Sequence, residues 1–250
     1  AEGELAGAAL RGQRKALRTA SLSLVFSFLA FTVMQCFFCL SGISTRETYF
    51  EKYQDMWDIM VTVKDVGTDA FEKTEEIQKL AAVESAVVYQ KEADKRVITE
   101  EEMSEELKAL GGFSPASEEE AMETGSGWLV SAPLIIMDDE SFLAYCRQIG
   151  IAPRLSGAVV LNQIRDVTNP DFRHPEFVSY IKEPDAGEEA ASVLLPYNND
   201  KEMEAKIPVL AYTSEVPLLR EEYATIDYYE LVHFVPVSLW KEIKGRTGGA

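Results

Sequence analysis

The sequence TASLSLVFSFLAFTVMQCFFCLSGIST, residues 19–45, contains no charged side chain. An α-helix rises about 1.5 Å per residue and the hydrocarbon core of a bilayer is about 30 Å thick, so about twenty apolar residues can cross it. The few polar residues of the run are small or uncharged, and they are scattered instead of forming one polar face. We therefore predict that residues 19–45 form a transmembrane helix.

The charges on either side of this run predict its orientation. Residues 11–18 carry four basic side chains, whereas residues 46–52 mix two basic with two acidic ones. Basic flanks stay preferentially in the cytoplasm. Residues 1–18 are thus predicted to be a cytoplasmic lead-in, and residues 46–250 an extracytoplasmic domain of a plasma-membrane protein.

A cleaved signal peptide also starts with basic residues. Its apolar core spans about 7–15 residues and ends at a small-x-small cleavage site. Here the apolar run is longer, and its exit CLSGISTRE, residues 39–47, matches such a site poorly. The sequence favours a retained anchor over a signal peptide.

Small side chains line one narrow side of the predicted span. Ser23, Ser27 and Ala30 stand at positions i, i+4 and i+7. Such a face lets two membrane helices approach closely, although the same spacing also arises by chance. If the face packs, the partners of this helix lie outside this chain.

The formal net charge of the 250-residue chain is −18, and because residues 1–45 carry +2, residues 46–250 carry −20. An acidic domain repels nucleic acid and anionic lipid headgroups, so neither is predicted as a partner. A charged, well-solvated surface is the simplest explanation of this composition.

The cysteines argue against a disulfide framework. Cys146 alone lies outside the apolar run, so the predicted outer domain cannot form an internal disulfide. Cys36 and Cys39 have the spacing of a redox or metal pair, but their place within a lipid-embedded helix favours a packing role.

Beyond the run, strand and helix signals alternate. Ile59, Val61 and Val63 alternate with Asp58, Met60, Thr62 and Lys64 and predict a strand over residues 57–65 with one apolar face. A helix is predicted over residues 68–83, with Phe71, Thr74, Ile77, Leu80 and Ala81 on one stripe. Strand–helix–strand order within about forty residues is typical of a small α/β sandwich.

The remaining predicted segments follow the same pattern. Residues 100–127 are acidic and loose, with one short helix, and residues 183–201 are polar and irregular. The predicted strands are 85–89, 96–99, 128–137, 156–164, 207–213 and a strand before Ser238; the predicted helices are 138–148 and 238–245.

These elements predict an α+β protein, in which an N-terminal transmembrane helix precedes a two-lobed extracytoplasmic α/β-sandwich domain. The first lobe comprises about residues 56–100 and 205–250, and the second lobe, about residues 101–204, is inserted between them.

Motifs of catalysis or nucleotide binding are missing from the sequence. It contains no G-x-x-x-x-G-K-[ST] loop, no H-E-x-x-H and no G-x-S-x-G. His233 alternates within an apolar strand and is predicted to be a core or edge residue, and His174 sits in a proline-flanked loop without a companion. Gly125–Gly127 is interpreted as a linker.

One acidic cluster, Asp138, Asp139 and Glu140, offers paired carboxylates for calcium or for acid–base chemistry. Capping of the helix that starts there explains the same residues without a catalytic function. We therefore predict no catalytic, metal or cofactor site and no enzymatic activity.

The order of these segments resembles an ABC transporter permease of the FtsX/MacB type. The resemblance is carried by the basic lead-in, the single membrane helix, the stretch WDIMVTVKD…FEKTEEIQKLAAVESAVVYQ and the closing stretch YYELVHFVPVSLWKEIKG. It covers roughly residues 10–110 and 205–245 and is architectural. In that family a large extracytoplasmic domain (the MacB periplasmic core) follows the first helix, and three further helices normally come after it.

The resemblance implies a permease subunit that neither binds nor hydrolyses nucleotide. Such a subunit acts as a dimer of permease subunits or domains and pairs with a separate cytoplasmic ABC ATPase, for export or mechanical signalling. The short segment Ser44–Met56 is compatible with mechanical transmission from the helix to the domain. The alternative is a single-pass, membrane-anchored extracellular sensor or ligand-binding domain; the motifs disfavour an extracellular enzyme on a stalk.

Overall fold

The structure is a computed structural model. It describes residues 2–45, 59, 61, 70–113, 121–166, 168–169, 176–184, 189–196, 204–217 and 230–246. The chain divides into two compact units, Ala1–Asp58 and Ile59–Ala250.

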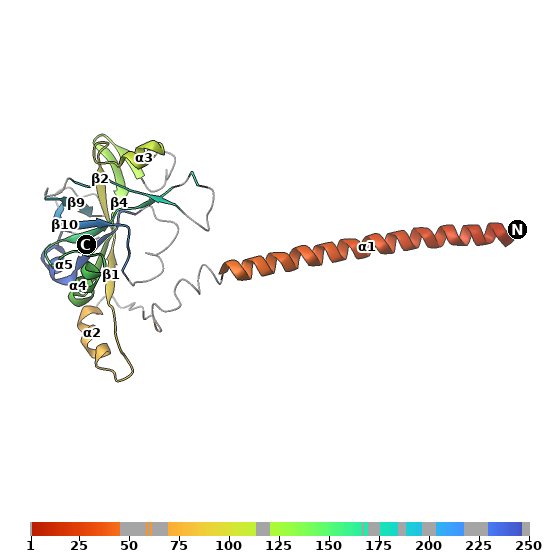
Figure 1. The fold of residues 1–250 in the computed structure, drawn as a ribbon, viewed down its shortest axis with the longest axis horizontal. Coiled ribbons are helices and arrows are strands. Elements are labelled where there is room, and N and C mark those ends of the chain that lie inside the picture. The colour runs from red at the N-terminus through yellow and green to blue at the C-terminus, as the bar shows by residue number, and fades with distance from the viewer. Residues whose placement is uncertain are drawn as a thin grey trace. The chain divides into compact units, whose positions relative to one another are not determined.

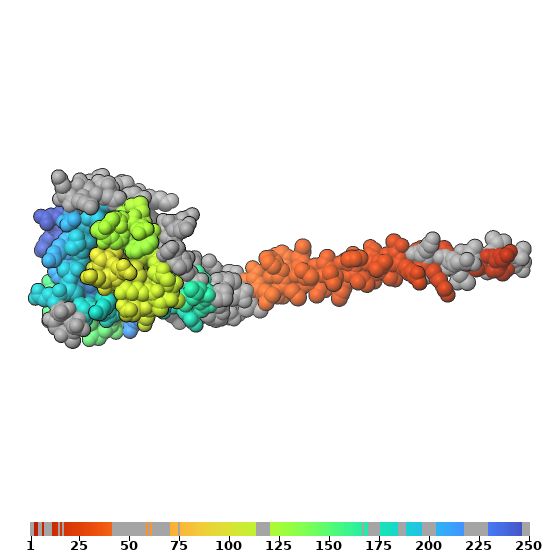
Figure 2. Space-filling view, turned by 90° about the horizontal axis from the view of Figure 1, so that it is seen from above, coloured from red at the N-terminus to blue at the C-terminus, as the bar shows by residue number. Residues whose placement is uncertain are grey.

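The first unit is built on one long helix, α1 (Glu2–Thr45), drawn in red and orange in Figure 1. By length and composition, its segment Gly12–Ser41 could cross a membrane; a signal sequence would meet the same criterion. The predicted span, residues 19–45, and nearly all of the predicted lead-in lie within this helix. In the space-filling view of Figure 2, residues 18–41 of α1 form a narrow rod.

The second unit is a mixed α/β domain with a nine-stranded sheet in the order β1-β5-β11-β6-β10-β9-β2-β4-β3. β5 pairs in parallel with β11, and β6 with β10, whereas the other neighbours are antiparallel. The strands are β1 (Tyr89–Glu92), β2 (Asp94–Ile98), β3 (Ala121–Thr124), β4 (Gly127–Ser131), β5 (Leu134–Met137), β6 (Ala158–Leu161), β9 (Ala191–Pro196), β10 (Ala205–Thr213) and β11 (His233–Pro236). A separate ribbon pairs β7 (Ile164–Arg165) with β8 (Phe177–Val178).

The sheet curls back on itself because β1 continues directly into β2 and β4 continues directly into β5. β1 with β2, and β4 with β5, form one long antiparallel ribbon that keeps the same register from Tyr89↔Met137 to Ile98↔Trp128. Pro133 has no N–H and stands where the ladder is interrupted. Since β5 pairs onward with β11 and β2 pairs onward with β9, the two sides of the ribbon close a barrel-like ring.

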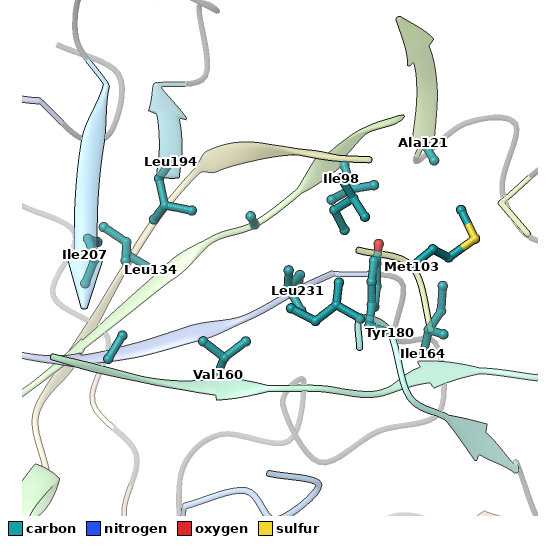
Figure 3. Close-up of a cluster of buried hydrophobic side chains, with 14 of the residues drawn as sticks. Ile98, Met103, Ala121, Leu134, Val160, Ile164, Tyr180, Leu194, Ile207 and Leu231 are labelled. Carbon is teal, nitrogen blue, oxygen red and sulfur yellow. The ribbon is translucent and has the colours of Figure 1, made fainter. Parts of the chain in front are cut away.

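The inward-facing residues of this ring form the larger core, part of which Figure 3 shows. Successive residues of a strand point to opposite faces, and Leu134, Val160 and Val235 therefore point inward, as do Leu194 and Ile207, all fully buried. The intervening residues of β5, β6 and β11 form a second core on the outer face.

Helices cover both cores. Phe142, Tyr145 and Cys146 of α4 (Asp139–Gln148) pack into the outer core. Trp240 of α5 (Val237–Ile243) and Phe71 of α2 (Ala70–Gln78) pack against the larger core. The short α3 (Glu105–Ala109) adds the buried Leu107 to it.

Several predicted elements are confirmed. α2 has Phe71, Thr74 and Ile77 on its covered side, although Leu80 and Ala81 lie beyond its end and are exposed. The predicted helix 138–148 is α4, and the strands over 96–99 and 207–213 are β2 and β10.

Other predictions differ from the structure. The strand predicted over 128–137 is two strands, because Pro133 interrupts it. The strand predicted over 156–164 ends at Leu161, and the strand at 85–89 begins only at Tyr89. β3 and β9 lie in segments interpreted as irregular. The strand over 57–65 falls outside the described residues, except for Ile59 and Val61, which are exposed and in no strand.

Strands from the two predicted lobes alternate within the one sheet. β11 and β10 come from the first lobe, and β5, β6 and β9 come from the second. No break in the sheet therefore coincides with the predicted boundaries near residues 100 and 205.

Candidate functional site

The first candidate is the surface of α1. Twelve large apolar side chains of this helix are 57–73% exposed, and they point in all directions around its axis. They are Leu22, Leu24, Val25, Phe26, Phe28, Leu29, Phe31, Val33, Met34, Phe37, Phe38 and Leu40. Such a continuous apolar surface is unfavourable in water and is suited to lipid or to other apolar helices.

Two polar side chains in this helix differ in their hydrogen bonding. The Thr32 hydroxyl donates to the carbonyl oxygen of Phe28 at 2.8 Å, so it is satisfied within its own helix. Gln35 Nε2 lies 3.9 Å from Cys39 Sγ, which is a weak acceptor.

The second candidate is the acidic cluster at the start of α4, where Asp138 is the N-cap. Its Oδ1 accepts from the backbone N–H of Ser141 at 2.8 Å, and its Oδ2 accepts from the N–H of Val88, just before β1, at 3.3 Å. The sequence predicts that Asp138 or Asp139 caps this helix, and the structure shows that the cap is Asp138. Asp138 thus accepts hydrogen bonds from one backbone N–H of α4 and from one just before β1.

Asp139 serves a different helix. The N-cap of α5 is Pro236, whose side chain has no oxygen and makes no capping hydrogen bond. Asp139 replaces it, because its Oδ1 accepts from the N–H of Ser238 at 3.0 Å and its Oδ2 accepts from the Ser238 hydroxyl. The prediction that Ser238 itself caps the last helix is wrong, since α5 starts one residue earlier and Ser238 lies inside its first turn.

In the part of the folded domain that the structure describes, the first helix, α2, and the last helix, α5, touch through one pair of aromatic rings. The rings of Phe71 in α2 and Trp240 in α5 lie 6.4 Å apart, centroid to centroid. Both side chains are partly buried against the larger core. The two helices therefore belong to one packed surface, although about 160 residues separate them in sequence.

The third candidate is a polar chain inside the barrel. Arg96 of β2, Ser192 of β9 and His233 of β11 are all buried. Arg96 Nη1 donates to Ser192 Oγ at 3.1 Å, and Ser192 Oγ lies 2.7 Å from His233 Nε2. His233 Nδ1 lies 2.8 Å from the carbonyl oxygen of Leu231.

The hydrogen-bond partners determine the state of His233. A carbonyl oxygen only accepts, so Nδ1 carries a proton and donates to Leu231. Burial lowers the pKa of His233 to about 3, and the charge of Arg96 acts in the same direction. The ring is therefore neutral, and its Nε2 accepts from the hydroxyl of Ser192. Of the two places predicted for His233, core or sheet edge, the structure shows the core.

The row of hydrogen-bonded polar side chains continues from Arg96 toward the surface. Arg96 Nη2 forms an ion pair with Glu102 Oε1 at 2.7 Å, and Glu102 Oε2 accepts from the N–H and the hydroxyl of Thr99. Burial raises the pKa of Glu102, but the hydrogen bonds from Thr99 and the charge of Arg96 outweigh it and hold the pKa below 4.5. Arg96 is thereby compensated, as a buried charge must be.

Ser192 and His233 have the separation of a nucleophile and a general base. Both side chains are 0% exposed, however, and Ser192 Oγ also accepts from Arg96. A substrate cannot reach this hydroxyl. The hydrogen-bonded side chains of Arg96, Ser192 and His233 therefore hold three strands of the barrel together instead of performing a reaction.

Three other residues considered in the sequence, His174, Gly125 and Cys146, add no candidate site. His174 lies outside the described residues, and Gly125 belongs to the hairpin between β3 and β4. Cys146 is buried, and burial raises the pKa of its thiol. Among the described residues, no group of three or more His, Cys, Asp or Glu side chains could hold a metal ion.

Comparison with known proteins gave no relative, since no protein-family model, no curated protein and no solved structure matches this chain.

Proposed function

We propose that this chain is a membrane-anchored permease subunit of the FtsX/MacB type. In this proposal α1 lies in the plasma membrane with its basic end in the cytoplasm, and the acidic α/β domain lies outside. The chain neither binds nor hydrolyses nucleotide; a separate cytoplasmic ABC ATPase drives it, for export or for mechanical signalling.

The continuous apolar surface of α1 supports the membrane part of the proposal. In water, exposure of twelve large apolar side chains on one helix would cost about 1.5–3 kcal/mol each relative to burial. Lipid removes this cost, and the helix satisfies its own backbone hydrogen bonds, as a membrane requires.

The meeting of α2 and α5 is the observation that carries the permease part. A domain inserted between two membrane helices needs its first and last elements side by side, so that the polypeptide can enter and leave at one place. The Phe71–Trp240 contact brings these two elements together. Asp138 and Asp139 add to this, because they join the backbone before β1 and the start of α5 to one helix.

The proposal is tested with the full chain in the membranes of an expressing cell. The protein should remain in the membrane pellet after carbonate extraction, with α1 intact in the purified product by mass spectrometry. External protease should digest the domain in intact cells. Recovery of a product that lacks α1, or a domain protected from external protease, would refute the anchored topology.

The ATPase partner is tested by affinity purification in mild detergent. An ATPase with a G-x-x-x-x-G-K-[ST] loop should co-purify and hydrolyse ATP, whereas a variant that lacks residues 2–45 should not recover it. A stable, membrane-inserted chain without such an ATPase would instead favour the sensor or ligand-binding alternative.

A further inference from the structure

We infer that the last described segment of the folded domain binds anionic phospholipid headgroups at the membrane surface, through Trp240, Lys241, Lys244 and Arg246. These four residues form what we call the basic surface. The inference rests on the proposed membrane anchoring, and it goes beyond that anchoring by naming a lipid-binding surface on the outer domain.

The basic surface has the opposite charge to the domain that carries it. Residues 237–246 contain three basic side chains and one acidic one, a net charge of +2, whereas residues 46–250 as a whole carry −20. The three cations are exposed, and within the described residues none of them forms an ion pair. Four other cations of the domain are each paired with a glutamate: Lys73, Lys91, Arg96 and Lys108. The cations of the basic surface are thus available to an external anion.

The acidic residue of this segment, Glu242, points away from the side of α5 on which Trp240 lies. Successive residues of a helix are rotated by about 100°. Relative to Trp240, Lys244 is therefore rotated by about 40° and Lys241 by about 100°, whereas Glu242 is rotated by about 160°. An anion beside Trp240 and Lys244 meets cations before it meets Glu242.

Trp240 adds the aromatic side chain that is typical of a membrane interface. Its side chain is partly exposed, and Lys244 Nζ lies 5.6 Å from the ring centroid. No residue of α5 is fully buried, so this helix lies shallowly on the domain. Trp is enriched where proteins meet lipid headgroups, and Lys and Arg direct their charge to the same layer. The combination favours a lipid surface over a soluble acidic partner.

Screening explains how a strongly acidic domain can carry such a surface. At physiological ionic strength the field of an exposed charge falls off over about 8 Å. A folded domain of about 190 residues has a radius of gyration of about 16 Å. Acidic residues on the other sides of the domain are therefore screened at the basic surface, although the net charge by itself predicts repulsion from anionic lipid.

The proposed topology turns the basic surface toward the bilayer. The ring of Trp240 contacts Phe71 of α2, the first described helix after α1. If the polypeptide enters and leaves the domain on this side, as the permease proposal requires, the side that holds α2 and α5 is nearest to the membrane. Each Lys or Arg near an anionic membrane surface favours the contact by about fivefold, so three of them favour it by about a hundredfold.

The test uses the full chain in lipid nanodiscs, made either of phosphatidylcholine alone or of phosphatidylcholine with phosphatidylglycerol. Amide hydrogen exchange in α5 should be at least about fivefold slower with phosphatidylglycerol, which is the effect of one cation near an anionic surface. Exchange in α3 is the internal reference and should not differ between the two bilayers. High salt should remove the difference in α5, because the attraction is electrostatic.

Two sets of substitutions separate the basic surface from the net charge. Replacing its three cations together by glutamine (Lys241→Gln, Lys244→Gln, Arg246→Gln) should abolish the difference between the two bilayers. The matched control removes the same charge from three exposed cations elsewhere on the domain and should keep the difference: Arg154→Gln, Lys182→Gln and Lys206→Gln. Cations that only complement the dipole of α5 would slow exchange equally in both bilayers.

Tryptophan fluorescence gives an independent readout. Phosphatidylglycerol with a nitroxide on its headgroup should quench part of the fluorescence of the full chain, because Trp240 lies at the headgroup layer. The Trp240→Phe variant should lose this part of the quenching. Equal quenching of the wild type and the variant would contradict the placement of Trp240 at the lipid surface.

Three results of the exchange experiment would overturn the inference. One is equal exchange of α5 in the two bilayers by a chain that stays in the membrane pellet, which would leave the proposed anchoring intact. The second is loss of the difference in both sets of variants, which would make the net charge responsible. The third is slower exchange on addition of polyglutamate without a response to phosphatidylglycerol, which would assign the surface to an acidic protein. Failure of the anchoring itself would be seen separately, as loss of the chain from the membrane pellet.

Discussion

At the level of single residues, Ser192 connects both parts of the buried polar chain. Replacing it by alanine leaves Arg96 Nη1 and His233 Nε2 without the bonds that they make to Oγ. Each buried polar group without its partner costs about 1–3 kcal/mol. We predict that Ser192→Ala lowers the free energy of unfolding by about 2–4 kcal/mol, measured by urea denaturation of the full chain in detergent.

The control for this substitution is Val193→Ala on the same strand, because the Val193 side chain is 39% exposed and points away from the barrel. It should lower the free energy of unfolding by less than about 1 kcal/mol. Equal effects of the two substitutions would show that the polar chain contributes nothing to stability.

The lowered pKa of His233 predicts that the stability of the folded domain depends on pH. Its pKa is lowered from 6.5 to about 3 in the folded domain, so the unfolded chain binds the proton more tightly. The contribution of the neutral His233 to the free energy of unfolding is fully present above pH 6.5 and is lost as the pH falls toward 3. Between pH 6.5 and 5 the loss is about 2 kcal/mol.

The measurement is thermal unfolding at several pH values, in the wild type and in His233→Gln. The variant has no group that titrates at this position, so its stability should fall less over the same pH range. Parallel pH profiles in the two proteins would contradict the assignment of a neutral, buried His233.

At the level of elements, α5 depends on a cap from another helix. Asp139→Ala removes the acceptor for the N–H of Ser238, and Pro236 cannot replace it. Loss of an N-cap costs about 1 kcal/mol. We predict this decrease in the free energy of unfolding, together with faster amide hydrogen exchange in the first turn of α5.

Glu140→Ala is the matched control, since it removes the same charge from the same turn of α4 and its side chain is exposed. It should change stability by less than about 0.5 kcal/mol. If exchange in α5 rises equally in both variants, the charge of the turn matters and the individual hydrogen bond does not.

The hairpin between β3 and β4 depends on Gly127. Its φ is +145°, and a Cβ atom at this position would collide with the carbonyl oxygen of Ile98. Gly127→Ala should therefore lower the free energy of unfolding by about 2 kcal/mol or more, measured by thermal or urea denaturation. Gly125→Ala, where a Cβ would meet no atom within 4 Å, should cost far less.

How far the sequence predicts an element depends on where its stability comes from. β5 and β6 are fully buried and read as apolar runs, and the helix α4 carries its own cap, Asp138. β3 has one buried residue, Ala121, and exists through its pairing with β4. Its own sequence therefore gave no periodic signal.

The candidate sites show the same limit. Capping by Asp138 involves a residue three positions away, so it is visible in the sequence. The contact of Asp139 with Ser238 spans 99 residues, and that of Ser192 with His233 spans 41. Such pairs follow from the strand order, which alternation of apolar residues does not reveal.

At the level of the whole molecule, the two units have opposite surface chemistry. α1 exposes apolar side chains from Leu22 to Leu40, whereas the folded domain buries most of its large apolar residues in two cores and carries most of the acidic charge. One chain that joins such units is suited to a boundary between lipid and water. If the domain responds to events at the N-terminal end of α1, the connection between the units must transmit force.

Insertion of about ten Gly and Ser residues after Thr48, which lies outside the described residues, tests this transmission, because such a segment is flexible. In a complex of the wild type with the proposed ATPase, we predict that ATP and Mg²⁺ change amide hydrogen exchange in α2 and α5. The insertion should abolish this change while the ATPase still co-purifies. A helix-forming insertion of equal length should retain most of the change, since it keeps the connection stiff. A full response with the flexible insertion would mean that the domain is tethered to the membrane helix without being driven by it, as expected for the sensor alternative.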